Sequence, residues 1–419
     1  MKNTVSFITK NFNRYDVSSL TAYEAIGGMK ALKKALVMDG EDIAALLTEA
    51  QIKGRGGAAY PMGKKWSQAK MVKAKQKVVI CNADEGEPCT FKDRTLLEKD
   101  PFNLLEGMII AGYAVEAQQG YIYLREEYSH LRPLLLRAIG QLEAAGFLGN
   151  DIMGKKGFDY KIHIATGAGA YVCGEGTALV ESIEGKSGRP RMKPPYIKQC
   201  GLYNYPTCVQ NVESLSLVAP ILNDDKKVYQ TYTVEGDHGS MGTKLVSVAG
   251  NVKNPGVFEI PFGVTVREII YGLAGGIAQD EKLNFIQFGG ASGKIANGDI
   301  LDTPYSYKHL AKAGVGVGSG AILVVDQRTS ILDFLLITQE FFSQESCGQC
   351  APCREGNRQI KSILQKIKTR QHSKADMEQL RLIAAIMAAT SLCGLGQASQ
   401  SALLCALDLF VDAFEVKGK

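Results

Sequence analysis

The sequence predicts three parts: an α/β domain with a largely parallel sheet, a small α+β domain, and a C-terminal helical bundle. In the first half of the chain, apolar segments of strand length alternate with segments of helix length. Near residue 240 a hairpin-like pattern, one helix and further strands replace this alternation. From Ile331 onward the apolar residues follow helical spacing. We therefore place the domains at 1–238, 239–328 and 329–419.

The amino-acid composition is typical of a folded, soluble protein. The 419 residues are 45% apolar and 22% charged, enough for two or three domains. No apolar run reaches the roughly 20 residues of a membrane span, and the start of the chain lacks the apolar segment of a signal peptide. We therefore expect no membrane insertion, and a cytoplasmic location with the ten cysteines reduced. The net charge of +5 is spread without a basic block, so nucleic acid is not an expected partner.

The first domain begins with helices and continues as alternating strands and helices. Leu32, Leu36, Ile43 and Leu47 supply apolar stripes within the helical stretch 17–50. The later elements are expected as strands at Val78–Cys81, Tyr121–Leu124 and Tyr160–Ala165, and as helices at Leu104–Ala117, Leu131–Ala145 and Thr177–Ile183.

The pattern in the middle of the chain predicts a small domain of the β-grasp kind. Asn254-Pro-Gly256 predicts a hairpin turn, because these residues favour tight turns. The expected elements are strands at Lys244–Ala249, Val257–Ile260, Phe285–Phe288 and Ala321–Val325, and a short helix at Val266–Leu273. Beyond Ile331, the spacing of Ile360, Ile363, Leu364 and Ile367 predicts helix.

Four cysteines near the C-terminus carry the most specific signal. Cys347, Cys350 and Cys353 are each separated by two residues, and Cys393 follows after a long helical stretch. A run of three plus one distant thiolate is typical of an iron–sulfur cluster, whereas a structural zinc site more often shows two Cys-x2-Cys pairs. Cys353 is expected at the start of a helix, where free N–H groups stabilise thiolates, and Gly394 is expected to end one. The other six cysteines lack ligand-like grouping.

Two glycine-rich loops lie in the first domain. The loop at 54–63 offers accessible backbone N–H groups, with Arg55 and Lys65 adding positive charge. It follows a helix, so its match to a dinucleotide fingerprint is weak and an ordinary connection is equally compatible. The loop at 167–177 follows a strand and opens a helix, a context that suits a phosphate at the helix N-terminus.

Acidic residues and an amide follow the first predicted strand, in the segment 81–94. This position suits the hydroxyl groups of a ribityl or ribose chain, although a solvated loop explains the segment equally well. No Ser/His/Asp or Cys/His set stands out among only five histidines. Cofactor-borne redox chemistry therefore fits better than acid–base hydrolysis.

Taken together, these motifs resemble one family, the NADH-binding flavoprotein subunit of respiratory complex I, shared with soluble NAD(P)-linked hydrogenases and formate dehydrogenases. The resemblance runs from about Tyr23 to Leu407. It implies one FMN, one [4Fe-4S] cluster held by the four cysteines, a β-grasp middle domain and a cluster-bearing helical bundle. It also implies NAD(H) or NADP(H) as substrate, with hydride passing to the flavin and single electrons passing to the cluster.

The resemblance also assigns site residues. The residues expected at FMN are Gly54, Arg55, Gly56, Lys65, Asn82, Asp84, Glu85, Tyr171, Gln210 and Asn211. The residues expected at the nicotinamide nucleotide are Tyr60, Glu87, Glu175, Gly176 and Tyr196. No general base is implied, because the flavin carries the chemistry.

Several positions depart from the family pattern. Gly176 stands where a carboxylate usually faces the adenosine ribose, and such a carboxylate would repel a 2′-phosphate. The absence of this carboxylate predicts either a relaxed preference for NADH over NADPH or the use of NADPH itself. Tyr60 and Tyr196 replace phenylalanines, while Gln210 replaces an asparagine that contacts flavin or phosphate in the family.

The favoured function is an FMN-dependent NAD(P)H oxidoreductase subunit of a soluble complex, with electron bifurcation as an option. Hydrogenase, transhydrogenase and formate dehydrogenase complexes are the candidates. The chain shows no second cysteine cage, so we expect a thioredoxin-like [2Fe-2S] partner and a further iron–sulfur or catalytic subunit. The alternatives are the NADH-binding subunit of membrane-associated complex I and a non-catalytic iron–sulfur relay.

Overall fold

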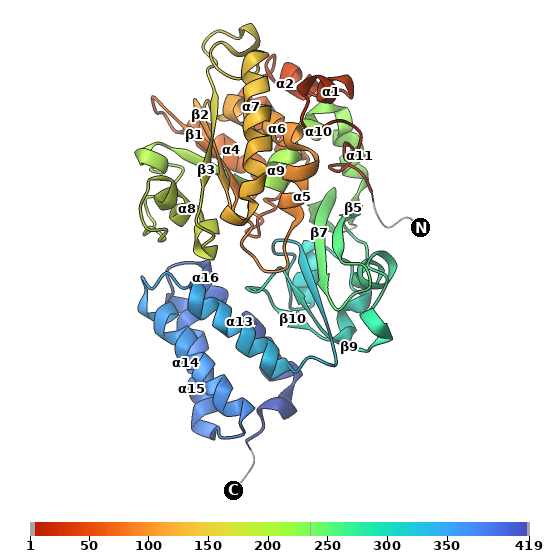
Figure 1. Ribbon diagram of the computed structural model, residues 1–419, viewed down its shortest axis with the longest axis vertical. Helices are drawn as coiled ribbons and strands as arrows, with labels where there is room; N and C mark the ends of the chain where they lie inside the picture. The colour runs from red at the N-terminus through yellow and green to blue at the C-terminus, as the bar shows by residue number, and fades with distance from the viewer. Residues whose placement is uncertain (1–4, 235, 417–419) are drawn as a thin grey trace.

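The computed structural model describes residues 5–234 and 236–416. Figure 1 shows a sheet flanked by helices at the top, a second sheet at the lower right and the C-terminal helices at the lower left. The two sheets and the C-terminal helices meet near the centre of the molecule. No helix within the described residues is long and apolar enough to span a membrane.

The first sheet is parallel throughout, in the order β3-β2-β1-β4. The inner strand β1 (Val78–Ala83) is mostly apolar and almost fully buried, as expected for a parallel strand covered on both faces. Three strands were predicted within a few residues of their ends, and β4 was missed. The strands are β1 (Val78–Ala83), β2 (Gln119–Leu124), β3 (Lys161–Thr166) and β4 (Thr207–Asn211).

Helices pack around this sheet, and the most buried of them is Pro101–Val115. Its Gly107 lets the backbone of a second helix approach, because a Cβ there would lie 2.1 Å from the Leu215 carbonyl oxygen. The helices are α1 (Leu20–Ala25), α2 (Lys30–Ala35), α3 (Gly40–Glu49), α4 (Met62–Met71), α5 (Lys92–Lys99), α6 (Pro101–Val115), α7 (Arg132–Ala144), α8 (Gly176–Ile183), α9 (Val212–Ser216), α10 (Val218–Pro220) and α11 (Lys226–Thr231).

The second sheet has the order β10-β9-β11-β7-β8, and the predicted hairpin is its antiparallel pair β7 and β8. The helix predicted at Val266–Leu273 forms as a wider, π-helical turn over Glu268–Leu273. A separate two-stranded pair, β5 with β6, precedes this sheet. The elements are β5 (Thr233–Val234), β6 (Asp237–Met241), β7 (Thr243–Gly250), β8 (Gly256–Pro261), β9 (Leu283–Phe288), β10 (Ile295–Ala296), β11 (Ala321–Asp326) and α12 (Tyr307–Lys312).

The remainder of the described chain is helical, as predicted. Ser373 and Asp376 form a capping box that fixes the start of one long helix. One expectation was wrong: Gly394 begins a helix instead of ending one, because the preceding helix already stops at Thr390. The helices are α13 (Ile331–Glu345), α14 (Ala351–Lys368), α15 (Lys374–Thr390), α16 (Gly394–Ala398) and α17 (Ser401–Leu409).

Apolar contacts join these parts into a connected interior. One cluster places Phe285 and Val325 of the second sheet against Leu335 of α13. A second cluster contains both Ile80 of the first sheet and Cys353 of α14. The cavities described next lie within the first unit and between it and the other two.

Candidate functional site

A cavity of about 460 Å³ opens beyond the carboxyl ends of β1 and β4, and we call it the inner cavity. This is the expected position for a ligand on a parallel sheet. The predicted residues Asp84, Glu85, Glu87 and Tyr171 line it. The polar segment that follows β1 therefore forms a wall of the cavity. This position does not support the alternative that the segment is an ordinary solvated loop.

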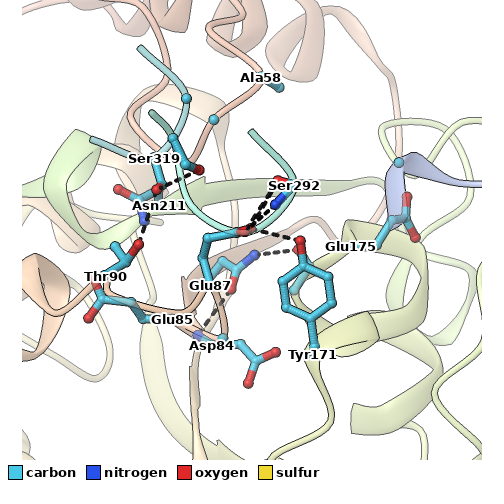
Figure 2. Close-up of a pocket in the computed structure, with 18 of the residues that line it drawn as sticks. Ala58, Asp84, Glu85, Glu87, Thr90, Tyr171, Glu175, Asn211, Ser292 and Ser319 are labelled. Atoms are coloured by element: carbon cyan, nitrogen blue, oxygen red, sulfur yellow. Dashed lines mark hydrogen bonds between the residues drawn. The ribbon is translucent and has the colours of Figure 1, made fainter. Parts of the chain in front are cut away.

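Glu87 stands at the centre of this wall between two different parts of the chain (Figure 2). The Tyr171 hydroxyl donates to its carboxylate at 2.7 Å. From the second sheet's side, the Ser292 backbone N–H donates at 2.9 Å and the Ser292 hydroxyl at 3.3 Å. Burial raises the pKa of Glu87, while these donors oppose the shift.

Asp84 and Glu85 are buried carboxyls with raised pKa values. Burial raises the pKa of Asp84 to about 7, although the charge of Arg125 opposes the shift. Its Oδ2 is buried and has no hydrogen-bond partner among the described residues. Burial and the charge of Asp93 raise the pKa of Glu85, whose carboxylate accepts the N–H groups of Asp93 and Arg94.

A second cavity of about 390 Å³, the outer cavity, adjoins the first. The predicted residues found only in the outer cavity are Gly54, Tyr60, Lys65, Gly176, Tyr196 and Gln210. The predicted residues that line both cavities are Gly56, Asn82, Glu175 and Asn211. The shared lining joins the two cavities into one continuous cleft. The individual ligand contacts stay predictions.

Arg55 is the one predicted site residue whose side chain lies outside the cleft. It lines neither cavity and is 1% exposed. Its guanidinium donates to the Tyr229 hydroxyl at 2.8 Å and the Thr243 carbonyl at 2.9 Å, and lies 4.0 Å from Glu213. These buried partners hold the side chain away from the cleft, in the contact with the second sheet.

The start of α8 also differs from the prediction of a phosphate site. Glu175 caps this helix, because its carboxylate accepts the N–H groups of Thr177 at 2.8 Å and Ala178 at 3.0 Å. Lys193 pairs with the same carboxylate at 2.7 Å. Despite burial, these contacts lower the pKa of Glu175. The helix N-terminus therefore already holds an anion.

The second sheet supplies part of the inner cavity that sequence reasoning missed. Gly289 and Ser292 follow β9, while Gly318 and Ser319 precede β11, and all four line the cavity. The Ser319 and Thr90 hydroxyls lie 3.1 Å apart across the junction (Figure 2). The glycine-rich stretches 289–293 and 314–320 were the available signal, since such loops permit close backbone approach.

The four predicted cysteines surround a small separate cavity at the end of α13 and the start of α14. The last of them, Cys393, is the N-cap of α16. No three His, Cys, Asp or Glu side chains in the described residues converge tightly enough for one metal ion. The four cysteines surround this space in the three-plus-one arrangement that is typical of an iron–sulfur cluster.

Local contacts shape this cage. Burial raises the pKa of the Cys353 thiol to about 11, although the Ser346 hydroxyl lies 3.2 Å away and opposes the shift. Burial likewise raises the pKa of Cys393, while the N–H groups of Leu395 and Gly396 oppose it. Iron binding therefore has to displace protons from these thiols, and the N–H groups at the start of α16 favour the resulting thiolate.

Three residues line both the inner cavity and the cysteine cavity: Val172, Cys393 and Leu395. The two spaces are therefore separated by the thickness of single side chains. Gly394 and Ala398 of α16 also line the inner cavity. One short helix thus serves both spaces.

Comparison with known proteins follows the same division. Residues 47–220 match the Nuo51 FMN-binding domain, residues 245–296 the SLBB domain, and residues 333–417 the NADH-ubiquinone oxidoreductase-F iron-sulfur binding region. An NADH-quinone oxidoreductase subunit of Aquifex aeolicus is 40% identical over 99% of this chain and 95% of its own length. The chain belongs to the family of these FMN-binding NADH-quinone oxidoreductase subunits.

Hydrogenase subunits are related to this family member to a similar degree. NADP-reducing hydrogenase subunit HndC of Solidesulfovibrio fructosivorans is 38% identical over 99% of this chain and 84% of its own length. A crystal structure of an NAD⁺-reducing [NiFe]-hydrogenase in the H₂-reduced state superposes with a TM-score of 0.85 at 33% identity. That match covers 96% of this chain and 66% of the hydrogenase chain, so this chain spans about two thirds of the length of that chain.

The residues present fit both family cofactors. The cleft combines an unpartnered buried carboxyl oxygen at Asp84 with glycine-lined walls, as a polar, flat cofactor requires. The cage offers four cysteine sulfurs around a space, the donor set of a [4Fe-4S] cluster. The predicted FMN and [4Fe-4S] cofactors are therefore confirmed for this family member, and the zinc alternative is set aside.

Proposed function

We propose that this chain is the FMN-dependent, NAD(P)H-oxidising subunit of a soluble multisubunit complex. The observation that carries the proposal is the shared wall of Val172, Cys393 and Leu395 between the inner cavity and the cysteine cage. FMN, when bound, supplies the exchange between two-electron hydride chemistry and one-electron transfer. The family membership supports this function over the non-catalytic relay.

The proposal gives the cleft residues defined tasks. Asn82, Asp84, Glu85 and Asn211 hold the flavin by hydrogen bonds at the ends of β1 and β4, with Gly56 letting the backbone approach. The nicotinamide nucleotide lies along the same cleft toward the outer cavity. The protein's own contribution is orientation and exclusion of water.

The test is anaerobic reduction of the purified complex by NADH and by NADPH. We expect FMN to copurify with the complex. Its visible absorbance should bleach as soon as a nucleotide that the enzyme oxidises is mixed in. A Cys393→Ala variant should lose the cluster and retain little FMN, because this side chain lines both spaces. A preparation without flavin, or with flavin that neither nucleotide bleaches, would support the relay instead.

We further propose that the outer cavity accepts NADPH. Gly176 lines this cavity and offers no carboxylate to repel a 2′-phosphate, while the charge of neighbouring Glu175 is paired with Lys193. A Cβ at Gly176 would lie 3.3 Å from the end of the Ile197 side chain, so a larger residue fits with a small adjustment. Gly176→Glu should therefore lower kcat/KM for NADPH about 10-fold or more, relative to NADH, through like-charge repulsion.

The measurement is the ratio of steady-state kcat/KM values for NADPH and NADH. Gly176→Gln is the matched control, since it adds similar volume without charge. Strict NADH preference in the unmodified protein would exclude this part of the proposal.

The partner complex follows from the same chemistry. We infer a [2Fe-2S] thioredoxin-like partner and a further iron–sulfur or catalytic subunit of a hydrogenase, transhydrogenase or formate dehydrogenase. The similarity to HndC supports this assignment, whereas the 40% identity to the Aquifex aeolicus protein supports complex I as the second candidate. Mass spectrometry of the subunits that copurify decides between them. Electron bifurcation stays a prediction.

We also propose that the domains are 1–238, 239–328 and 329–419, with the middle unit as a β-grasp domain and the last as a cluster-bearing bundle. We propose a cytoplasmic location for the chain. None of the ten cysteines, each within the described part of the chain, forms a disulfide, which supports a reducing compartment.

A further inference from the structure

Two tyrosines lie exposed at the outer cavity. The side chains of Tyr60 and Tyr196 are part of its lining, yet they are 42% and 52% exposed. Large aromatic faces left open to water are favourable sites for a flat aromatic group. The two rings come from different segments, the first glycine loop and the stretch after the prolines at 194–195.

A hydrogen-bonded bridge connects these two segments. The Tyr60 hydroxyl donates to Gln68 Oε1 at 3.1 Å, and Lys198 Nζ donates to the same oxygen at 3.0 Å. Lys198 Nζ also lies 5.9 Å from the centre of the Tyr196 ring. One amide oxygen on α4 therefore ties both aromatic walls together. We call Tyr60, Gln68, Lys198 and Tyr196 the clasp.

We propose that the clasp is a positioning device that fixes the spacing of Tyr60 and Tyr196 for the purine base of the dinucleotide. This inference rests on the proposed function. The redox-active end of the substrate belongs in the inner cavity, because that space shares its wall with the cysteine cage. The base at the opposite end is then left to the outer cavity, where the two open rings lie.

The chemistry of the clasp depends on its particular side chains. A phenylalanine in place of Tyr60 would have no hydroxyl to donate, so the bridge requires the phenol. Gln68 accepts two hydrogen bonds on one oxygen, and Lys198 uses one of its three N–H groups while its charge faces an aromatic ring. Neither Gln68 nor Lys198 lines the cleft, so both act through the tyrosines.

Gln68→Met and Lys198→Met in the holoenzyme complex test the proposal. Each should raise KM for the preferred reduced dinucleotide about 3- to 10-fold, the effect of losing one or two modest hydrogen bonds, with kcat unchanged. KM for reduced nicotinamide mononucleotide, which lacks the purine end, should not change. Binding of ADP-ribose, measured by calorimetry, should weaken by the same factor as the dinucleotide.

Conservative variants separate positioning from general damage. Gln68→Glu keeps an acceptor oxygen and Lys198→Arg keeps a cationic donor, so both should restore most of the affinity. The double variant Tyr60→Phe with Gln68→Met should be no worse than Gln68→Met alone, because both remove the same bond. Lys73→Met, at an exposed lysine just beyond α4, is the control for loss of positive charge.

The outcomes are distinct. An unchanged ADP-ribose affinity in Gln68→Met, or an equal rise in KM for the mononucleotide, would overturn the clasp. An unmodified complex that oxidises no nicotinamide nucleotide would overturn the proposed function, while ADP-ribose binding would still report on the clasp.

Discussion

At the scale of single residues, Asp84 shows how the cleft is prepared for a ligand at a cost to the empty protein. Its carboxyl is buried with one oxygen unpartnered, and burial raises its pKa to about 7. Native protein therefore binds more protons than unfolded protein between pH 4 and pH 7. The stability of the flavin-free chain should fall as pH rises through that window.

Asp84→Asn is expected to separate stability from binding. The variant should raise the melting temperature of the flavin-free protein at pH 8, with a smaller gain at pH 5, because the charged form is the costly one. Its affinity for FMN should fall about 10-fold, the effect of losing one charged acceptor. Differential scanning calorimetry and flavin fluorescence titration measure the two effects. A variant less stable than the parent at pH 8 would contradict this account.

Whether a site residue could be predicted from sequence depended on whether its surroundings are set by neighbouring residues in the chain. Asn82, Asp84 and Glu85 could be predicted because they directly follow a buried strand, and the end of a parallel strand faces the ligand side. Arg55 could not, because its partners Glu213 and Tyr229 lie far along the chain. A cation in a glycine loop has the same sequence pattern whether it faces a phosphate or a buried carboxylate.

At the scale of elements, α16 is the component that serves both cofactor spaces. Its N-cap is Cys393, and Gly396 packs tightly against the rest of the cage. A Cβ on Gly396 would lie 2.6 Å from Ser391 Oγ and 2.8 Å from the Cys353 Cβ, whereas a Cβ on Gly394 would meet nothing within 4 Å. Alanine at Gly396 would therefore crowd the cage, whereas alanine at Gly394 of the same helix would not, so the second substitution is a control for the first.

Gly396→Ala should lower the iron and acid-labile sulfide content of the purified chain strongly, because overpacking costs about 1–3 kcal/mol and displaces cage residues. Gly394→Ala should keep the iron content of the parent. Metal analysis of both variants, purified in parallel without oxygen, gives the answer. Equal iron content in the two variants would show that this packing does not hold the cage.

Element prediction succeeded where apolar runs were continuous and failed where they were not. The strands at β1, β2 and β3 and the long α13, α14 and α15 regions carried clear apolar patterns. The missed β4, Thr207–Asn211, mixes polar and apolar residues because it ends at the ligand side of the sheet. The Gly394 error arose because glycine both ends helices and begins them, and only the end of α15 at Thr390 decides.

At the scale of the whole molecule, buried charges join helices α5 and α9 of the first domain to the second sheet. Glu213 of α9 accepts from Lys244 Nζ of β7 at 2.6 Å and from the Leu245 N–H at 3.0 Å. Lys92, which lines the inner cavity, lies 3.0 Å from the same carboxylate. Although burial opposes it, these cations hold the pKa of Glu213 at about 2. Sequence alone cannot place such a contact, since it depends on how separate domains pack.

Glu213→Gln should destabilise the protein by about 3–5 kcal/mol, because it leaves buried cations without their counter-charge. FMN affinity should fall as well, since Lys92 borders the cavity. Chemical denaturation and flavin titration measure these changes. Asp302→Asn, which breaks the exposed pair with Arg267, is the control and should change neither quantity appreciably. Similar effects from both substitutions would show that the buried network has no special weight.

The wall shared by the two cofactor spaces has a consequence for how the protein matures. Cys393 borders the flavin cavity and the cluster cage, so a cage without iron leaves the cavity with an unanchored side. Cofactor insertion should then follow an order, with the cluster first and the flavin second. Cells starved of iron should accumulate a chain that lacks both groups, and restoring iron should restore flavin retention without new synthesis of the protein.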